Sequence, residues 1–410
     1  MRKKYVIIDY PRLVRLNPNI PWKTRGNGAI SFQVGTNGTH AKKIGAMKNL
    51  DFFMVNTSDQ DLDIQDIKNL KTIIIDVIDV FAEIQGQNTN PGAVIIPDQP
   101  PYRIYQQAVR GIFTISEIKK LLVKYNSEII SYKNARGLIG ATAATAWRPS
   151  NDYTYELIAY RQKSRWGSQR DINAESVQKI DKNVPSTFDN YDYIHHHNRI
   201  APNSPCPILY GIRGQKPTDL PKAMDIVKSE EYESWIIYQS NQGTDDHLQK
   251  SKISSIIPYS SVIVKGTVAT LPNTIKGGHV IFSIKDDSDT IDVAAYEPTK
   301  GFRNIIRQLM IGDNVTVYGG VRKEPLTINL EKIFIKTLVS VTEKLENPIC
   351  SKCGKHMKSI GKDQGFRCRK CGLCSKDPIY HKKSREIVPG WYEAPVCARR
   401  HLVKPLKLMK

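Results

Sequence analysis

The chain has 410 residues, and 60 lysines and arginines against 40 aspartates and glutamates give it a formal net charge of +20 at pH 7. An apolar content of 40% excludes a wholly disordered chain, and the length predicts about three domains. So large a positive excess predicts a polyanionic partner, most simply a nucleic acid.

The positive charge is concentrated toward the C-terminus, and neither the start of the chain nor its longest apolar run resembles a membrane segment. Residues 343–410 hold 17 basic and 6 acidic residues, which is over half of the net charge. The basic start, Met1–Asp9, lacks the apolar stretch of a secretory signal. The longest apolar run, Thr72–Phe81, contains Asp76 and Asp79 and is too short and too charged to cross a membrane. We therefore expect a cytoplasmic protein without membrane contact.

The first glycine-bearing segment, Pro11–Ile30, is predicted to be a loop that leads into a strand at Ala29–Val34. Glycines let a backbone approach phosphate oxygens, and nearby cations neutralise them. A rigid surface loop is the alternative. The candidates for binding a nucleotide or a reacting base are Lys23, Arg25, Gly26 and Asn27.

A second candidate for anion binding begins at Arg136 and Gly137, where a run of small residues predicts a helix. Close packing of that helix explains the small residues equally well. A strand is predicted at Tyr153–Arg161. Farther on, His195–His197 is interpreted as a loop, because adjacent histidines do not point at one metal in regular structure; metal binding is the minor alternative.

A polar loop follows the apolar run Trp235–Tyr238, and ligands commonly bind at such strand ends. A plain turn is the competing interpretation. The candidate substrate-binding residues are Asn241, Gln242, Gly243 and Thr244, and the candidate catalytic residues are Asp245, Asp246 and His247.

An OB-fold β-barrel is predicted next, because strands and one helix alternate in the order β-β-β-α-β-β. Gly266 is interpreted as a bulge in the first strand. Such barrels usually bind single-stranded nucleic acid, although a purely structural barrel is the alternative. The expected strands are Ser261–Thr270, Gly278–Lys285, Thr290–Tyr296, Asn314–Val321 and Thr327–Lys336, with the helix at Lys300–Met310.

Two C-x-x-C-G turns near the C-terminus predict a closed, structural zinc site of four thiolates. The ligands are Cys350, Cys353, Cys368 and Cys371. The lysines and arginines inside the turns favour contact with phosphates. Whether Cys374, Cys397 or His401 replaces a ligand, or forms part of another site, stays open.

Taken together, the motifs resemble one family. PRLVRLNPNIPWKTRGNGAI, RGLIGATAA, YTYELIAYR, QSNQGTDDHL, GGHVIFSI, AAYEPTKGFRNIIRQL, the two cysteine turns and ARRHLVKPL occur in the order found in archaeal tRNA(Ile) 2-agmatinylcytidine synthetases, over essentially the whole chain. The resemblance implies an α+β multidomain protein. Its modules would be a kinase-type α/β domain at 1–130, a ferredoxin-like domain at 131–252, an OB-fold at 253–342, and a zinc ribbon with a C-terminal tail at 343–410.

The resemblance also implies a ligase reaction. ATP, with Mg²⁺, would phosphorylate the carbonyl oxygen of the wobble cytidine in the CAU anticodon of isoleucine tRNA, and agmatine would displace the phosphate, so that the tRNA reads AUA. A carboxylate suits a guanidinium, so Asp245 or Asp246 would face agmatine. The alternative is a non-catalytic nucleic-acid-binding protein with an OB-fold and a zinc ribbon.

One departure from the family pattern concerns the N-terminus. The family begins with an Asp-Asp-Thr-Asp-Ser segment that holds Mg²⁺ and ATP, followed by an autophosphorylated threonine, whereas Met1–Ile8 here continues directly into Asp9. Asp9 belongs to the later piece and is not a candidate metal ligand. Either the start codon lies farther upstream, or the chain is truncated, or it depends on a separate fragment. We therefore expect weak or no ATP-dependent turnover from residues 1–410 alone.

Overall fold

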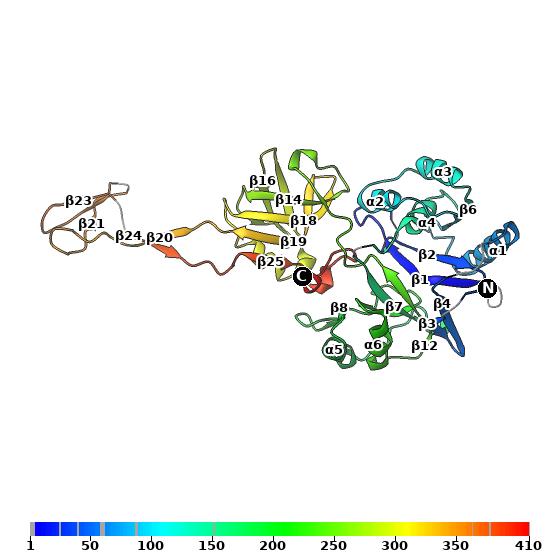
Figure 1. The fold of residues 1–410 in the computed structure, drawn as a ribbon. Coiled ribbons are helices and arrows are strands. Elements are labelled where there is room, and N and C mark those ends of the chain that lie inside the picture. The colour runs from blue at the N-terminus through cyan, green and yellow to red at the C-terminus, as the bar shows by residue number, and fades with distance from the viewer. Residues whose placement is uncertain are drawn as a thin grey trace.

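The computed structural model describes residues 5–23, 26–38, 41–57, 62–86, 89–150, 152–362, 364–376 and 379–409. It is elongated: an α/β body and a β-barrel lie side by side, and a slender stalk carries the last small unit away from both (Figure 1). No helix among the described residues is long and apolar enough to span a membrane.

An eight-stranded sheet forms the centre of the α/β body, in the order β2-β1-β4-β3-β12-β7-β11-β8. The strands are β1 (Val6–Arg15), β2 (Gly28–Gly35), β3 (Lys42–Met47), β4 (Leu50–Val55), β7 (Thr154–Arg161), β8 (Thr187–Phe188), β11 (Ile208–Gly214) and β12 (Tyr232–Ser240). Because strands from before and after residue 130 share this sheet, the first two predicted modules are continuous, and the boundary between them stays a prediction.

The expectation that Pro11 opens a loop is wrong, since β1 runs through it to Arg15. The register of β1 against β2 shifts between Ile8 and Arg12, which spares the proline from a ladder hydrogen bond. This shift also lets β1 change partners: Ile7 and Ile8 pair with β4, and Arg12 and Leu13 pair with β12.

Four helices and a small sheet pack at the β2 edge of the large sheet (Figure 1). They are α1 (Ile64–Phe81), α2 (Tyr102–Arg110), α3 (Ile115–Lys124) and α4 (Gly137–Ala146), with β5 (Gly92–Ile95) and β6 (Glu128–Ser131). Capping boxes at Asp63 and Thr114 begin α1 and α3. The predicted helix of small residues is α4, which lies close enough to β2 for the Ser31 hydroxyl to donate to the Ala144 carbonyl at 2.8 Å.

The expected ferredoxin-like module is confirmed by its topology. Two helices, α5 (Ala174–Asn183) and α6 (Leu220–Ile226), cross between strands in the order β7-α5-β8-β11-α6-β12, and the strands lie in the order β12-β7-β11-β8. A short hairpin of β9 (Tyr191–Asp192) and β10 (His197–Asn198) contains the predicted histidine loop. The helical turns η1 (Lys163–Arg165) and η2 (Pro217–Asp219) complete the module.

The expected OB-fold is confirmed, since its five main strands close through a β14–β16 pairing. They are β14 (Ser261–Val268), β16 (Val280–Lys285), β17 (Thr290–Ala295), β18 (Asn314–Arg322) and β19 (Thr327–Thr337), with the short strands β13 (Gln249–Lys250) and β15 (Asn273–Thr274). The helix, α7 (Phe302–Ile306), is shorter than expected and follows the turn η4 (Glu297–Thr299); η3 (Ile253–Ser255) lies before β14.

Gly266 does not form the predicted bulge, because β14 pairs with β18 without a register shift across it. A Cβ at this position would lie 2.8 Å from the carbonyl oxygen of Lys285. The glycine therefore allows β14 to cross closely to β16, where the barrel closes.

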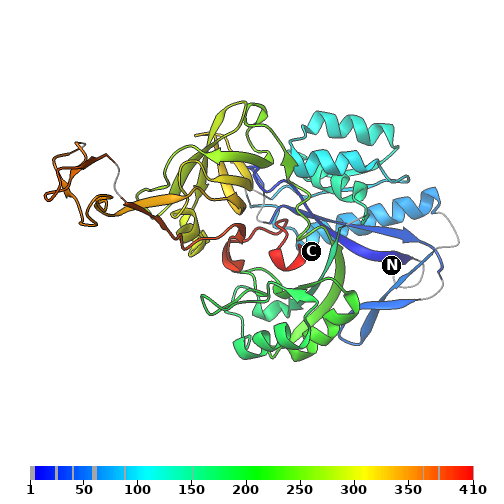
Figure 2. The same cartoon turned by 60° about the vertical axis from the view of Figure 1, so that its left-hand side comes forward.

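The predicted C-terminal module divides into a ribbon and a returning tail. The stalk strands β20 (Val341–Glu346) and β24 (Ile379–Lys383) carry the ribbon, which contains β21 (Lys358–Ser359), β22 (Phe366–Arg367) and β23 (Cys374–Ser375). The chain then returns: β25 (Gly390–Glu393) pairs with β19, and η5 (Val396–Ala398) and η6 (Leu406–Leu408) follow. Figure 2 shows this tail, residues 390–409, between the barrel and the α/β body.

Candidate functional site

A cavity of about 300 Å³ opens at the N-terminus of α4, beside the start of β2. Four of the six residues predicted to bind a nucleotide or base line it together: Lys23, Asn27, Arg136 and Gly137. Gly26 is adjacent in the chain, with a backbone φ of +81°, and Arg25 lies outside the described residues. Two segments more than a hundred residues apart thus contribute to one site.

Two cations and a tryptophan among the lining residues make this cavity positively charged and partly aromatic. The Arg136 guanidinium lies 5.0 Å from the centre of the Trp22 ring, a stacking arrangement, and the Trp22 side chain is half exposed. The Lys23 ammonium donates to the Pro18 carbonyl, and burial lowers the pKa of both Lys23 and Arg136. Within the described residues neither cation has a carboxylate partner, so an incoming anion would be stabilised.

Gly137 brings the backbone of α4 against the start of β5. A Cβ on Gly137 would lie 2.4 Å from the Asn90 carbonyl oxygen and 2.5 Å from the Gly92 nitrogen. The helix N-terminus is therefore held beside Arg136, at the cavity, by backbone contact.

The loop Asn241–His247 follows β12 as predicted, but the structure places it inside a joint between modules. The Asn241 side chain continues the ladder of β1, since it accepts from the Arg15 N–H at 2.7 Å and donates to the Arg15 carbonyl at 2.8 Å. Gly243, with φ of +67°, donates to the His401 carbonyl at 2.8 Å, and Thr244 donates to the Asn241 carbonyl at 2.7 Å.

The three candidate catalytic residues each face another module. Asp245 forms an ion pair with Lys332 of β19 and accepts from the Lys404 N–H at 2.7 Å. Asp246 accepts from the Tyr105 hydroxyl of α2 at 2.7 Å, and burial raises its pKa. His247 lies 3.0 Å from a Glu331 carboxylate oxygen. The agmatine contact of Asp245 or Asp246 stays a prediction; this geometry favours a structural role.

A buried charge cluster beside that loop was missed from the sequence. Glu156 of β7 receives Arg213 at 3.3 Å, Arg15 at 3.7 Å and the Gln242 amide at 2.5 Å. Gln242 in turn contacts His401 Nδ1 at 2.9 Å. The one available signal was a carboxylate in the middle of a strand that is mostly apolar and aromatic, Thr154–Arg161.

His401 in this cluster gives a pH prediction. The charge of Arg15, burial and Arg213 lower its pKa well below the ordinary 6.5. Below pH 6.5 the unfolded chain therefore binds a proton that the folded chain refuses, so stability falls by up to about 1.4 kcal/mol per pH unit. We expect His401→Asn, which keeps a donor near Nδ1, to flatten the decline in melting temperature between pH 7.5 and 5.5. A slope equal to that of the unsubstituted chain would contradict this.

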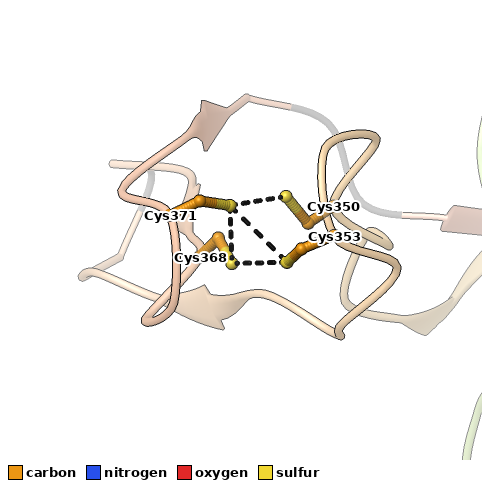
Figure 3. Close-up of side chains that lie close together, drawn as sticks. All are labelled: Cys350, Cys353, Cys368 and Cys371. Carbon is orange, nitrogen blue, oxygen red and sulfur yellow. Dashed lines mark hydrogen bonds between the residues drawn. The ribbon is translucent and has the colours of Figure 1, made fainter.

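The four cysteines of the ribbon converge as predicted. Their sulfurs all lie within 4.8 Å of one another, with Cys350 to Cys371 at 3.2 Å and Cys353 to Cys368 at 3.5 Å (Figure 3). Cys374 is exposed, and Cys397 and His401 lie in the tail, so none of the three joins this set.

The donor set fits zinc. The Cys371 N–H directed at the Cys368 sulfur lowers the pKa of that thiol to about 6, whereas the contact with Cys350 raises the pKa of Cys371 to about 12. Four crowded thiols cannot all ionise without a cation between them. A tetrahedral zinc ion would supply that charge and hold the two turns together.

Comparisons with known proteins match every module. Family models match as the TiaS TCKD domain (residues 1–134), the TiaS FLD domain (135–247), an OB-fold nucleic acid binding domain (262–335) and the TiaS C-terminal zinc ribbon domain (347–387). The tRNA(Ile) 2-agmatinylcytidine synthetase TiaS of Methanocaldococcus jannaschii is 40% identical, over 98% of this chain and 91% of its own length. Its counterpart in Archaeoglobus fulgidus is also 40% identical, over 98% and 89%.

Solved structures of TiaS also match the chain over nearly its whole length. The crystal structure of a complex of TiaS with its isoleucine tRNA and ATP is 39% identical and superposes with a TM-score of 0.83, over 98% of this chain and 89% of that one. A complex of TiaS with the same tRNA, AMPCPP and agmatine is 36% identical with a TM-score of 0.80, over 99% and 89%. The chain belongs to the tRNA(Ile) 2-agmatinylcytidine synthetase (TiaS) family.

Proposed function

We propose that the chain uses ATP to join agmatine to the carbonyl carbon of the wobble cytidine in the CAU anticodon of isoleucine tRNA. The relatives carry the name of this activity, and the related crystal structures hold isoleucine tRNA with ATP, or with AMPCPP and agmatine. The observation that supports it best in this chain is the cavity in which Lys23, Asn27, Arg136 and Gly137 meet.

The cavity suits the phosphate chemistry of that reaction. A carbonyl oxygen leaves poorly, and its phosphorylation makes it a good leaving group, so that the amine nitrogen of agmatine forms a bond to the carbon as the C–O bond breaks. Lys23, Arg136 and the positive N-terminal end of the α4 dipole would neutralise the phosphate, and Trp22 offers a ring face for stacking. Titrations with ATP and with the anticodon stem-loop decide whether ATP or the extruded base occupies the cavity.

Among the described residues no aspartate or glutamate lines the cavity, so we assign no residue to Mg²⁺, which the family pattern pairs with ATP. The barrel and the basic ribbon would bind the tRNA, and the site of action would be the cytoplasm.

Substitution of Arg136 tests the proposal. We expect Arg136→Ala to reduce agmatine-dependent mass gain of the tRNA by about 10²-fold, because a cation at the transferred phosphate is lost. Arg103→Ala is the matched control, since Arg103 is an exposed arginine of α2 outside the cavity. Mass spectrometry of the tRNA and calorimetric titrations with ATP and with the anticodon stem-loop provide the readouts.

The titrations also work without turnover. If ATP occupies the cavity, Arg136→Ala weakens ATP binding at least about tenfold. If the base occupies it, the same substitution weakens binding of the anticodon stem-loop instead. A chain that binds tRNA but neither ATP nor agmatine would be the non-catalytic nucleic-acid-binding protein. The expectation of weak turnover stays a prediction that the same assay tests.

A further inference from the structure

A second group of metal-ligand side chains lies far from the ribbon. Asp192 and His195 of the β9–β10 hairpin meet Cys397 of η5, and their ligand atoms all lie within 4.8 Å of one another. His195 and Cys397 are 202 residues apart. We propose that these three side chains bind a zinc ion, which fastens the C-terminal tail to the ferredoxin-like module.

The three ligand atoms converge with nearly the spacing that zinc requires. His195 Nδ1 lies 2.9 Å from Asp192 Oδ2 and 3.8 Å from Cys397 Sγ. Zinc bonds to nitrogen, oxygen and sulfur place tetrahedral ligand atoms about 3.3–3.7 Å apart, so shifts of a few tenths of an ångström suffice. The other carboxylate oxygen, Asp192 Oδ1, accepts the N–H groups of Ile194 and His195 at 3.1 Å each, which fixes the orientation of Oδ2.

The same three residue types could instead form a thiol nucleophile with its base, but the geometry is wrong for that role. In such a triad the carboxylate and the nucleophile contact opposite nitrogens of the imidazole. Here Asp192 and Cys397 both face Nδ1. An oxygen and a sulfur that both lie beside the same imidazole nitrogen could, together with that nitrogen, coordinate one cation placed between them.

The surroundings leave room for an ion to enter. Asp192 is buried, the His195 side chain is 29% exposed, and Cys397 is partly buried. The Pro298 carbonyl lies 4.0 Å from the Cys397 sulfur, and a water molecule would supply the fourth ligand. Arg199 donates to the Cys397 carbonyl at 3.4 Å.

The position explains what such an ion would do. The hairpin belongs to the ferredoxin-like module, Pro298 to η4 of the barrel, and Cys397 to the tail that has just returned from the ribbon. Zinc here would replace the thiol proton and crosslink the tail at the point where three modules meet. It would therefore stabilise the docked tail independently of the ribbon.

Zinc content separates the two sites. The full-length protein is saturated with zinc chloride, freed of excess metal by gel filtration, and analysed by mass spectrometry for zinc per chain. We expect about two ions per unsubstituted chain and about one in Cys397→Ser and in His195→Ala. The controls keep about two: Cys374→Ser removes an exposed thiol, and His196→Asn changes the neighbouring histidine, whose φ of +52° asparagine tolerates.

Cobalt substitution shows which site is lost. The variants should retain the four-sulfur spectrum of the ribbon and lose a weaker component with one sulfur ligand. Trypsin should also cleave the tail faster in Cys397→Ser than in Cys374→Ser when zinc is present. One zinc ion in the unsubstituted chain, or two in both Cys397→Ser and His195→Ala, would overturn the proposal.

Discussion

Chelation of zinc is expected to unfold the ribbon, residues 347–376, while the barrel and the α/β body stay folded. The buried core of the ribbon consists of Cys350, Cys368, Met357 and Phe366, so two of its four buried side chains are metal ligands. Structural zinc contributes about 10–16 kcal/mol of apparent binding energy in small zinc-dependent domains, far more than so small a core supplies. The body has its own cores and joins the ribbon through the β20–β24 stalk (Figure 1).

Hydrogen exchange measured by mass spectrometry gives the test. Amide protection in the ribbon should disappear in EDTA and in Cys353→Ser, and remain in Cys374→Ser, which keeps all four ligands. Cys353→Ser also distinguishes the ribbon from the proposed tail site, which it does not touch. Ribbon amides that stay protected in Cys353→Ser would show that zinc does not hold this unit together.

Loss of the ribbon should also weaken tRNA binding. The segment 352–376 carries eight lysines and arginines. If several of them contact phosphates, Cys353→Ser lowers the salt dependence of the tRNA dissociation constant as well as the affinity. An unchanged salt slope would mean that these charges do not contact the tRNA.

The sequence was most informative where a pattern is local. Alternation in 261–337 predicts the barrel strands within a few residues, and the spacing of the cysteine turns predicts which four cysteines converge. The cavity residues Lys23 and Arg136 were also found, because a cation beside a glycine is a local sign of anion binding.

Contacts between residues far apart in the chain could not be predicted in the same way. Residues 241–247 have the composition of a ligand loop, and only the structure shows that their polar groups are directed at β1, α2, β19 and the tail. Part of the charge assigned to the last module is likewise paired: Arg399 binds Asp189, and Lys404 binds Asp152 at 2.8 Å. Residue type predicts that a buried charge needs a partner, but not which partner.

Lys332→Met is expected to destabilise the protein by about 3–5 kcal/mol, because it leaves the Asp245 carboxylate without its cation in a largely dry joint. Lys332 is fully buried, pairs with Asp245 and donates to the Lys404 carbonyl at 3.0 Å, so one ammonium connects the barrel, the polar loop and the tail. Lys336→Met, on the exposed end of the same strand, is the matched control and should change stability by less than about 0.5 kcal/mol.

The double variant Lys332→Met with Asp245→Asn decides what Asp245 does. If the pair is structural, removing the orphaned charge restores part of the lost stability in urea unfolding, and Asp245→Asn alone leaves the agmatine KM unchanged. If Asp245 faces agmatine, Asp245→Asn raises that KM while the melting temperature stays near that of the unsubstituted chain. The contacts with Lys332 and Lys404 favour the first result, in which a loop with the composition of an active site positions the modules that form one.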